Sequence, residues 1–344
     1  MAKEVILTGL RSNAEFHIGN YLGAILPMVN LQKKYAGAHQ FNMFIPDLHS
    51  FTTPIDHGSL YEQSLQNLNL FVAAGLDINA PDTYIYRQSY VPAHSEMTWI
   101  LDCFSYFGEL SRMTEFKDKS TGKEQDNISV GLFNYPALMA ADILLYGAKW
   151  VPVGDDQRQH LEFTRDIATR INNKFGELLV VPEPIDAQLK FSGRDQPVRI
   201  RSVRSPEKKM SKSVEDPAGT IMLSDKPEEA AQKIMSATTD SLGKVSFDWE
   251  KQPGVTNLLQ ILALFSGRPQ EEVNREWAGK SSYDELKTAT SRVVGDFLSE
   301  LQANLAKIDQ AEVKKKLEAG EAAMSRVAET TLLKVQKAVG LRPR

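Results

Sequence analysis

The chain has 344 residues, of which 42% are hydrophobic and 24% charged, with a formal net charge of −4 and a pI of about 6.0. This length has room for a Rossmann-sized domain and a smaller second one. Because the chain is weakly acidic overall, any contact with a polyanion depends on local basic patches. The single cysteine, Cys103, excludes an intramolecular disulfide and a Cys-rich zinc site, and we expect it to be buried.

The first residues lead directly into a short apolar run, with neither a signal-type apolar core nor an Arg-rich transit segment. No stretch of the sequence approaches the roughly 20 apolar residues that a membrane helix needs. We therefore expect a cytoplasmic protein with no membrane partner.

A short apolar run at residues 5–8 predicts a first strand, which Gly9 ends. A helical pattern begins after Gly19, so the order is strand, glycine-bearing loop and helix. In an open α/β sheet such a loop lies at the carboxyl end of the strand, and the amides of the following helix favour an anion. His17, Gly19 and Asn20 fall at this junction, which predicts a phosphate-facing role. The alternative is a histidine on a surface turn.

Apolar runs at residues 41–45 and 84–86 predict two further strands, separated by a helix at about 59–74. Strands that alternate with helices indicate a parallel sheet. His49 lies just past the second strand, at the carboxyl edge of the sheet. Residues 95–146 are mainly helical, with a polar break at 117–124 that predicts a flexible loop.

Residues 135–146 form a compact apolar helical pattern in which Asp142 is the only charged residue. Burying a carboxylate without a partner costs several kcal/mol. Asp142 therefore either faces water or meets a hydrogen-bond donor.

Residues 150–153 predict a short buried strand, and Gly154, Asp155, Asp156 and Gln157 follow it. A helix begins after them. Apolar runs at 179–181 and 198–200 are expected to complete the sheet.

The segment 208–213 reads Lys-Lys-Met-Ser-Lys-Ser, with turn-forming residues on both sides, and predicts a mobile loop. Its ammonium and hydroxyl groups suit a polyanion, because several charges and small donors can converge on phosphate oxygens. A solvated basic turn is the alternative.

After Pro217 strand patterns largely disappear, and apolar residues recur every three or four positions at 230–235, 258–265, 284–308 and 311–339. The expected fold is α/β: a Rossmann-type parallel-sheet catalytic domain at 1–214, with a helical insertion at about 95–146, and an all-helical domain at 215–344. The last helix is expected to pack back on the first domain.

Two segments resemble the signatures of class I aminoacyl-tRNA synthetases. Residues 209–213 match Lys-Met-Ser-Lys-Ser, and residues 17–20, His-Ile-Gly-Asn, resemble the first signature. Residues 135–157 are more specifically similar to the tryptophanyl enzymes, and the similarity runs from Gly9 to about Gly340. This resemblance implies ATP-dependent activation of L-tryptophan and its transfer to the 3′ end of tRNA(Trp).

The resemblance also implies a role for individual residues. Those expected in catalysis are His17, Lys119, Lys209, Ser211, Lys212 and Ser213. Those expected to bind ATP are Arg11, His17, Gly19, Asn20, Gly154, Asp156, Gln157, Ile200, Lys209 and Lys212. Those expected to bind tryptophan are Leu7, Gly9, His49, Met139, Asp142, Val151, Val153 and Gln157. Mg²⁺ would be carried with ATP, and no metal site of the protein's own is expected.

Several positions depart from the tryptophanyl pattern. Leu7 stands where bacterial members usually have phenylalanine, residues 11–14 replace Gln-Pro-Ser-Gly, Leu48 replaces a glutamine and Arg201 a methionine. The related tyrosyl enzymes are the alternative, but Leu7 and Met139 stand where those enzymes read a phenolic hydroxyl, and neither can do so. A non-catalytic nucleotide- or RNA-binding paralogue and a small-molecule nucleotidyltransferase are further alternatives.

Recognition of tRNA is expected in the helical domain, where residues 314–316 and 342–344 carry basic clusters that are as well explained as solvated surface. The resemblance also implies a symmetric homodimer.

Overall fold

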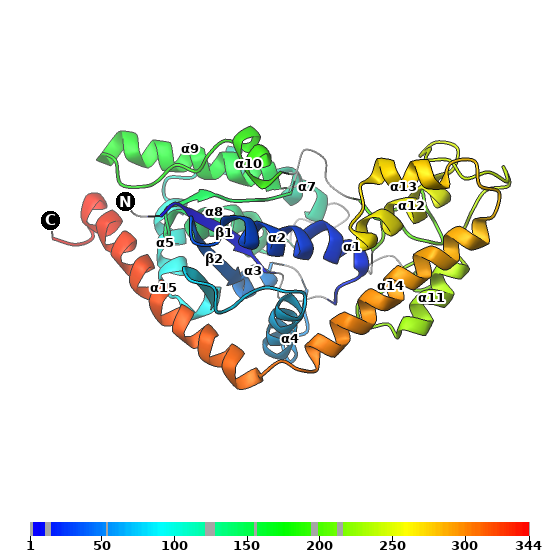
Figure 1. Cartoon of the computed structure of the whole chain (residues 1–344). Coiled ribbons are helices and arrows are strands. Elements are labelled where there is room, and N and C mark those ends of the chain that lie inside the picture. Colours follow the sequence, from blue (N-terminus) through cyan, green and yellow to red (C-terminus); the bar gives the residue numbers. More distant parts are fainter. Residues whose placement is uncertain are drawn as a thin grey trace.

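The computed structural model describes residues 3–10, 15–52, 54–120, 128–154, 157–193, 199–211 and 216–343. Its sheet has four parallel strands in the order β3-β2-β1-β4, which confirms the α/β class (Figure 1). The strands are β1 (Val5–Gly9), β2 (Gln40–Ile45), β3 (Thr83–Arg87) and β4 (Ala148–Trp150).

Helices follow every strand. Between β1 and β3 they are α1 (Ile18–Asn20), a π-helical turn η1 (Tyr21–Ile25), α2 (Leu26–Tyr35), α3 (Asp47–Ser50) and α4 (Leu60–Ala73). Between β3 and β4 they are the 3₁₀ turn η2 (Gln88–Tyr90), α5 (Ala93–Asp102), α6 (Phe107–Leu110), α7 (Thr114–Ser120) and α8 (Val130–Leu144). After β4 come α9 (Arg158–Phe175), α10 (Ile185–Ser192), α11 (Pro227–Met235), α12 (Pro253–Ser266), α13 (Gln270–Trp277), α14 (Tyr283–Leu305) and α15 (Gln310–Val339).

The strand order places a topological switch beside β1. The chain moves from β1 to β2 and β3 on one side, and then returns to add β4 on the other side of β1. Connections that leave in opposite directions open a crevice at the carboxyl ends of β1 and β4, where ligands bind in open α/β sheets. Gly9 at the end of β1 and Val151 just after β4 lie at this crevice edge.

Two expected strands are absent from the sheet. Residues 179–181 and 199–200 have no strand structure, and Val198 lies outside the described residues. The Asn172 side chain instead accepts hydrogen bonds from the Leu178 and Leu179 amides and donates one to the Leu179 carbonyl. These side-chain bonds satisfy backbone groups that would otherwise need a neighbouring strand.

The strand expected at 150–153 is also shorter and earlier than predicted. β4 ends at Trp150, and the Val151 amide donates to the Gln188 side chain at 2.8 Å rather than to another strand. Gln188 also donates to the carbonyls of Lys149 and Glu183, both at 3.0 Å. A single amide on α10 thus closes this edge of the sheet.

Helices α11 to α14 form a group beyond α1, while α15 runs back along β3 (Figure 1). A Cβ atom added to Gly320 of α15 would collide with the carbonyl oxygen of Ile85, so the helix and strand backbones are in direct contact. Arg87 and Glu321 form a buried ion pair across this contact. No helix in the described ranges is both long and apolar enough to cross a bilayer.

Candidate active site

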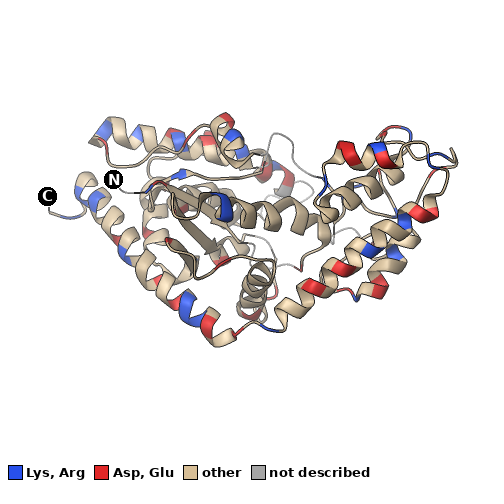
Figure 2. Ribbon diagram, in the orientation of Figure 1, with Lys and Arg blue, Asp and Glu red and all other residues tan. Residues whose placement is uncertain are grey.

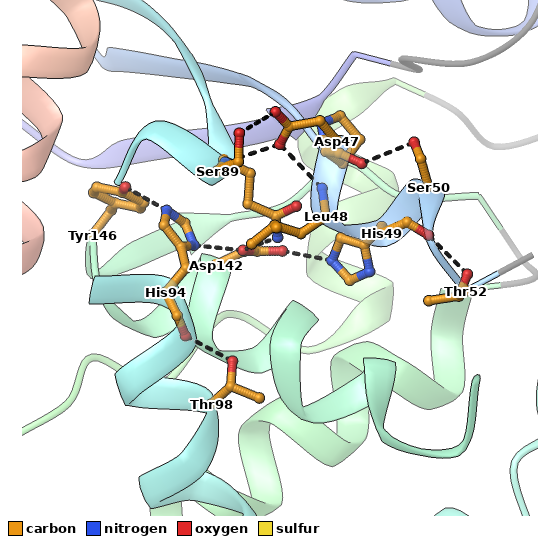
Figure 3. Close-up of polar contacts among 12 residues, drawn as sticks. Asp47, Leu48, His49, Ser50, Thr52, Ser89, His94, Thr98, Asp142 and Tyr146 are labelled. Carbon is orange, nitrogen blue, oxygen red and sulfur yellow. Dashed lines mark hydrogen bonds and ion pairs between the residues drawn. The ribbon is translucent and has the colours of Figure 1, made fainter. Parts of the chain in front are cut away.

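Asp142 lies in α8 with no exposed surface and accepts hydrogen bonds from three side chains (Figure 3). Its Oδ1 atom is 2.7 Å from Gln88 Nε2 and 2.6 Å from His94 Nδ1, and its Oδ2 atom is 2.8 Å from His49 Nε2. Of the two possibilities left open by the sequence, the structure places Asp142 among donors rather than in water. Gln88 and His94 were not among the predicted site residues.

The Asp47 carboxylate joins the two segments that carry the donors His49 and Gln88. Asp47 Oδ1 accepts from the amides of Leu48 and Ser89, at 3.0 and 2.9 Å, and Asp47 Oδ2 accepts from the Ser89 hydroxyl (Figure 3). Asp47 follows β2, and Ser89 follows β3. The clamp therefore joins the turn that carries His49 to the turn that carries Gln88.

The charge of Asp142 is stabilised by its neighbours. Burial by itself would raise the pKa of this carboxyl group, but hydrogen bonds from His49 and His94 outweigh burial and hold its pKa below the ordinary value. Asp142 is therefore an ionised acceptor at neutral pH. A ligand that meets it must offer a donor.

Apolar side chains from several elements pack together with α8, the helix that carries Asp142. Leu7 and Val151 are buried in the same hydrophobic cluster as the inner face of α8, and Met139 and Val153 are half-buried against it. The ring of Tyr135 lies edge-on to that of His49, and its hydroxyl is 2.9 Å from His160 Nε2. The structure thus combines an apolar wall with one ionised acceptor, which suits a flat apolar ring with a single N–H group.

The first signature pairs with the chain just after the second one. The Ile18 amide donates to the Ile221 carbonyl at 3.0 Å, and the Leu223 amide donates to the Phe16 carbonyl at 2.9 Å. His17 lies between these bonds, opposite Met222. Two segments about two hundred residues apart in sequence are therefore adjacent in space.

Gly19 lies where a side chain would not fit. A Cβ atom there would be 2.9 Å from His17 Nδ1 and 3.4 Å from Ile200 Cβ. Asn20 Oδ1 accepts a hydrogen bond from the His17 amide at 3.1 Å, which fixes the start of the helix. His17, Gly19, Asn20 and Ile200 thus form one group, and their assignment to a nucleotide stays a prediction.

The first half of the second signature runs alongside residues 200–202. The Met210 amide donates to the Ile200 carbonyl, and the Ser202 amide donates to the Lys208 carbonyl, both at 3.0 Å. Lys209 lies opposite Arg201, with its side chain exposed, and the Ser211 carbonyl accepts from the Thr220 hydroxyl at 3.3 Å. Lys209 and Ser211 are therefore held next to Ile200.

The base of this loop depends on two residues that the sequence reasoning missed. Asn257 of α12 accepts from the Arg201 amide and donates to the Arg201 carbonyl, both at 3.0 Å. Asp216 accepts from the Ser202 hydroxyl at 2.7 Å and from the Gly219 amide at 3.1 Å. Asn257 lies 56 residues from Arg201, whereas Asp216 lies close after the second signature. No sequence pattern links either residue to the base of the loop, so only the folded chain reveals their role.

The remaining predicted residues are placed in part. Gly9 ends β1 beside Phe44, Gly154 is exposed after β4, and Gln157 precedes α9 with its amide 3.0 Å from the Gly154 carbonyl. The backbone of Lys119 belongs to α7, so the loop expected at 117–124 begins as a helix. Outside the described residues lie Arg11, Asp156, Lys212, Ser213 and the side chain of Lys119.

Residues 2–299 match the family model described as tRNA synthetases class I (W and Y). A tryptophan–tRNA ligase of Caldanaerobacter subterraneus subsp. tengcongensis is 46% identical over 336 residues, 98% of each chain. Another from Leifsonia xyli is 41% identical over 338 residues, covering 97% of this chain and 96% of its own.

Solved structures agree with these relatives. Tryptophanyl-tRNA synthetase from Mycoplasma pneumoniae superposes with a TM-score of 0.81 at 35% identity, over 99% of this chain and 98% of its own. The enzyme from Campylobacter jejuni, crystallised with ADP and tryptophan, gives a TM-score of 0.78 at 32% identity, over 98% and 99% of the two chains.

Proposed function

Because the chain belongs to the class I tRNA synthetases of the W and Y family, we propose that it activates L-tryptophan with ATP and transfers it to the 3′ end of tRNA(Trp). The tryptophan carboxylate attacks the α-phosphorus of ATP, the new C–O–P link forms and pyrophosphate leaves. The terminal adenosine hydroxyl of the tRNA then attacks the adenylate carbonyl and releases AMP. The three substrates of this reaction, tryptophan, ATP and tRNA, are all available in the cytoplasm, where we place it.

The observation that carries the choice of tryptophan is the buried, ionised Asp142 within an apolar wall. Its carboxylate accepts the indole N–H, while Met139 and Val153 contact the ring. A site built to bond one N–H rejects analogues that lack it by roughly 10⁴ or more, because its acceptor would then stay unpaired. Leu7 and Met139 offer a phenol no hydrogen bond, which argues against tyrosine.

The rest of the predicted tryptophan site surrounds the polar half of the substrate. Gly9, at the end of β1, leaves room for the α-carboxylate to approach ATP. His49 and Gln157 are the polar side chains assigned to the amino-acid end, and Val151 completes the apolar wall.

ATP is assigned to the edge formed by His17, Gly19, Asn20 and Ile200, with Ile200 beside the adenine. Gly154 and Asp156 are assigned to the ribose, and Arg11 to the phosphates. Adenylate formation needs alignment and stabilisation of negative charge on the leaving pyrophosphate rather than covalent protein chemistry.

Charge stabilisation is assigned to the second signature and the polar loop. Lys209 and Lys212 are assigned to supply positive charge to the pyrophosphate, Ser211 and Ser213 to supply hydroxyl donors, and Lys119 to bind the phosphates. His17, Asn20 and Lys209 offer donors and a cation but no carboxylate. Mg²⁺ is therefore held by the phosphate oxygens and water, which is its usual coordination with nucleotides.

tRNA is assigned to the helical segment. Lys314, Lys315 and Lys316 are exposed near the start of α15, where Figure 2 shows a blue segment of the ribbon with red segments beside it. Such a patch attracts phosphates in a salt-dependent manner.

A homodimer is supported by large apolar side chains exposed on three neighbouring helices. On α5, α6 and α8, Trp99 is 71% exposed, Phe107 75% and Val130 78%, more apolar surface than an isolated side chain explains. Cys103, expected to be buried, is exposed at the end of α5 in the same region. We assign this face to the second copy of the chain.

ATP–pyrophosphate exchange with each amino acid in turn tests the proposal. Exchange is expected with tryptophan, and tRNA(Trp) should then be charged. Exchange driven by tyrosine would support the tyrosyl alternative. The absence of exchange with every amino acid tested would support a non-catalytic paralogue.

A further inference from the structure

His94 and Tyr146 form a buried hydrogen-bonded chain behind the Asp142 carboxylate (Figure 3). His94 Nδ1 is 2.6 Å from Asp142 Oδ1, and His94 Nε2 is 2.7 Å from the Tyr146 hydroxyl. His94 is 0% exposed and Tyr146 5%, so neither meets a substrate directly. Any effect of these two side chains on a ligand passes through Asp142.

The direction of the hydrogen bonds follows from the charge of Asp142. An ionised carboxylate only accepts, so Nδ1 of His94 carries the proton and donates it. In a neutral imidazole Nε2 is then an acceptor and accepts a hydrogen bond from the Tyr146 hydroxyl, whose pKa is raised by burial. Tyr146 therefore fixes the tautomer of His94, and this tautomer provides the donor to Asp142.

The two carboxylate oxygens of Asp142 differ in how many hydrogen bonds they already accept. Oδ1 receives both Gln88 and His94, which uses its two lone pairs. Oδ2 receives His49, the one side chain of the described ranges found to donate to it. The His49 side chain is 19% exposed, whereas the His94 side chain is fully buried, so Oδ2 is bonded by the histidine that lies nearer to solvent. One lone pair of Oδ2 remains for a ligand.

We infer, resting on the tryptophan specificity proposed above, that His94 is a positioning residue. Tyr146 fixes the tautomer of its ring, and His94 then holds Asp142 as an acceptor that presents Oδ2 to the indole N–H. A carboxylate held in this way bonds an indole N–H but gains nothing from the ring sulfur of a benzothiophene. A rotated or protonated Asp142 discriminates less, because a carboxylic acid O–H can also donate. The chain from Tyr146 to Asp142 serves selectivity rather than the chemistry of adenylation.

The same arrangement determines a pH dependence. The titratable groups that face Asp142 are His49 of α3, His94 of α5, Tyr86 of β3 and Tyr146 after α8. Burial raises the pKa of Asp142, and the two histidines lower it. Without the His94 donor the pKa of Asp142 rises. As the pH falls, Asp142 is then protonated earlier, and tryptophan use is lost at a higher pH than in the wild-type protein.

The test compares tryptophan with β-(3-benzothienyl)alanine, in which sulfur replaces the N–H. The ratio of kcat/KM for the two in pyrophosphate exchange should fall roughly 10-fold or more in His94→Leu, because a hydrogen bond to a charged group is lost. In Tyr146→Phe the fall should be smaller. His94→Asn should restore much of the ratio, since its side-chain N–H₂ lies near the position of Nδ1. The KM for ATP should change little in all three.

Thr98→Val provides the matched control on the same helix. The Thr98 hydroxyl donates to the His94 carbonyl at 2.7 Å, on the side away from Asp142 (Figure 3). This variant should keep the wild-type ratio. The acid limb of kcat/KM for tryptophan should move to higher pH in His94→Leu but much less in His94→Asn.

An unchanged ratio and acid limb in His94→Leu would overturn the inference, and so would equal losses in His94→Leu and His94→Asn. If His94→Leu does not fold, Tyr146→Phe decides the question, because it keeps the aromatic ring and removes only the hydroxyl. An unchanged ratio there also overturns the inference. Wild-type protein that exchanges pyrophosphate without tryptophan would instead refute the proposed function.

Discussion

Replacing Glu321 by glutamine is expected to weaken the attachment of α15 to the sheet. Glu321 and Arg87 form a two-pronged ion pair, with Nε to Oε1 at 2.5 Å and Nη2 to Oε2 at 3.0 Å. Their side chains are only 6% and 9% exposed. Removing the carboxylate therefore leaves a guanidinium buried without its counter-charge.

The expected magnitude follows from this burial. Breaking one partner of a buried ion pair costs about 3–5 kcal/mol, far more than the pair contributes at a surface. The ring of Tyr90 lies 3.4 Å from the guanidinium of Arg87 and offsets part of the loss. The lower limit, about 3 kcal/mol, corresponds to roughly a 10²-fold increase in the local opening of α15.

Hydrogen exchange measured by mass spectrometry checks this prediction on the amides of α15 near Gly320. Glu318→Gln is the matched control, because Glu318 lies on the same helix, is 58% exposed and is 4.0 Å from Lys314. Its expected effect is below about 0.5 kcal/mol. A double replacement of Arg87 and Glu321 by leucine should exchange more slowly than Glu321→Gln, because no charge is left unpaired. Equal exchange in Glu321→Gln and Glu318→Gln would refute the reasoning.

Three further predictions concern the active site. Asp142→Ala should weaken tryptophan binding by about 10-fold or more and ATP binding much less, as measured by isothermal titration, since the charged acceptor is lost; equal losses would make Asp142 structural. Lys212→Ala should lower the adenylation rate in single-turnover assays with little change in tryptophan affinity, and an unchanged rate would remove the loop from the mechanism. Gly19→Ala places a methyl group 2.9 Å from His17 Nδ1 and 3.4 Å from Ile200 Cβ, so the KM for ATP should rise, whereas that for tryptophan should not.

The first three strands and the long helices could be predicted from local patterns. β1, β2 and β3 are apolar runs ended by glycine or followed by polar residues, and α14 and α15 show apolar residues at helical spacing over many turns. In both cases neighbours in sequence decide the structure. The short helices α10 and α13 were missed, although Gly193 in the left-handed conformation ends α10 and two glutamates begin α13.

The wrong strands have a physical cause that no window of sequence contains. Residues 179–181 are apolar enough for a strand, but the side chain of Asn172 takes over the backbone hydrogen bonds of Leu179. The Ile200 carbonyl accepts from the Met210 amide, and the side chain of Asn257 bonds the neighbouring backbone of Arg201. Asn257 is 56 residues from Arg201. A strand prediction counts apolar residues and does not register an amide that arrives from a distant helix.

The active site, too, could be predicted from the sequence only in part. Asp142 could be singled out because a lone acid in an apolar helix requires a partner. Its partners could not be identified, because Gln88 and His94 lie 54 and 48 residues away and no pattern links them to it. The signature segments were recognisable by their letters, whereas their pairing through His17 and Met222 depends on the completed sheet.

Helix α15 packs along β3, but it is synthesised long after that strand. β3 is an outer strand, and Glu321, the partner of Arg87, is synthesised 234 residues later. At about 5–20 residues per second, a ribosome leaves that edge open for on the order of 10 to 50 s. An open strand edge readily pairs with another chain. The long last helix is thus also the segment that ends the period in which newly made chains are most prone to aggregate, and a protein truncated before α15 carries that hazard permanently.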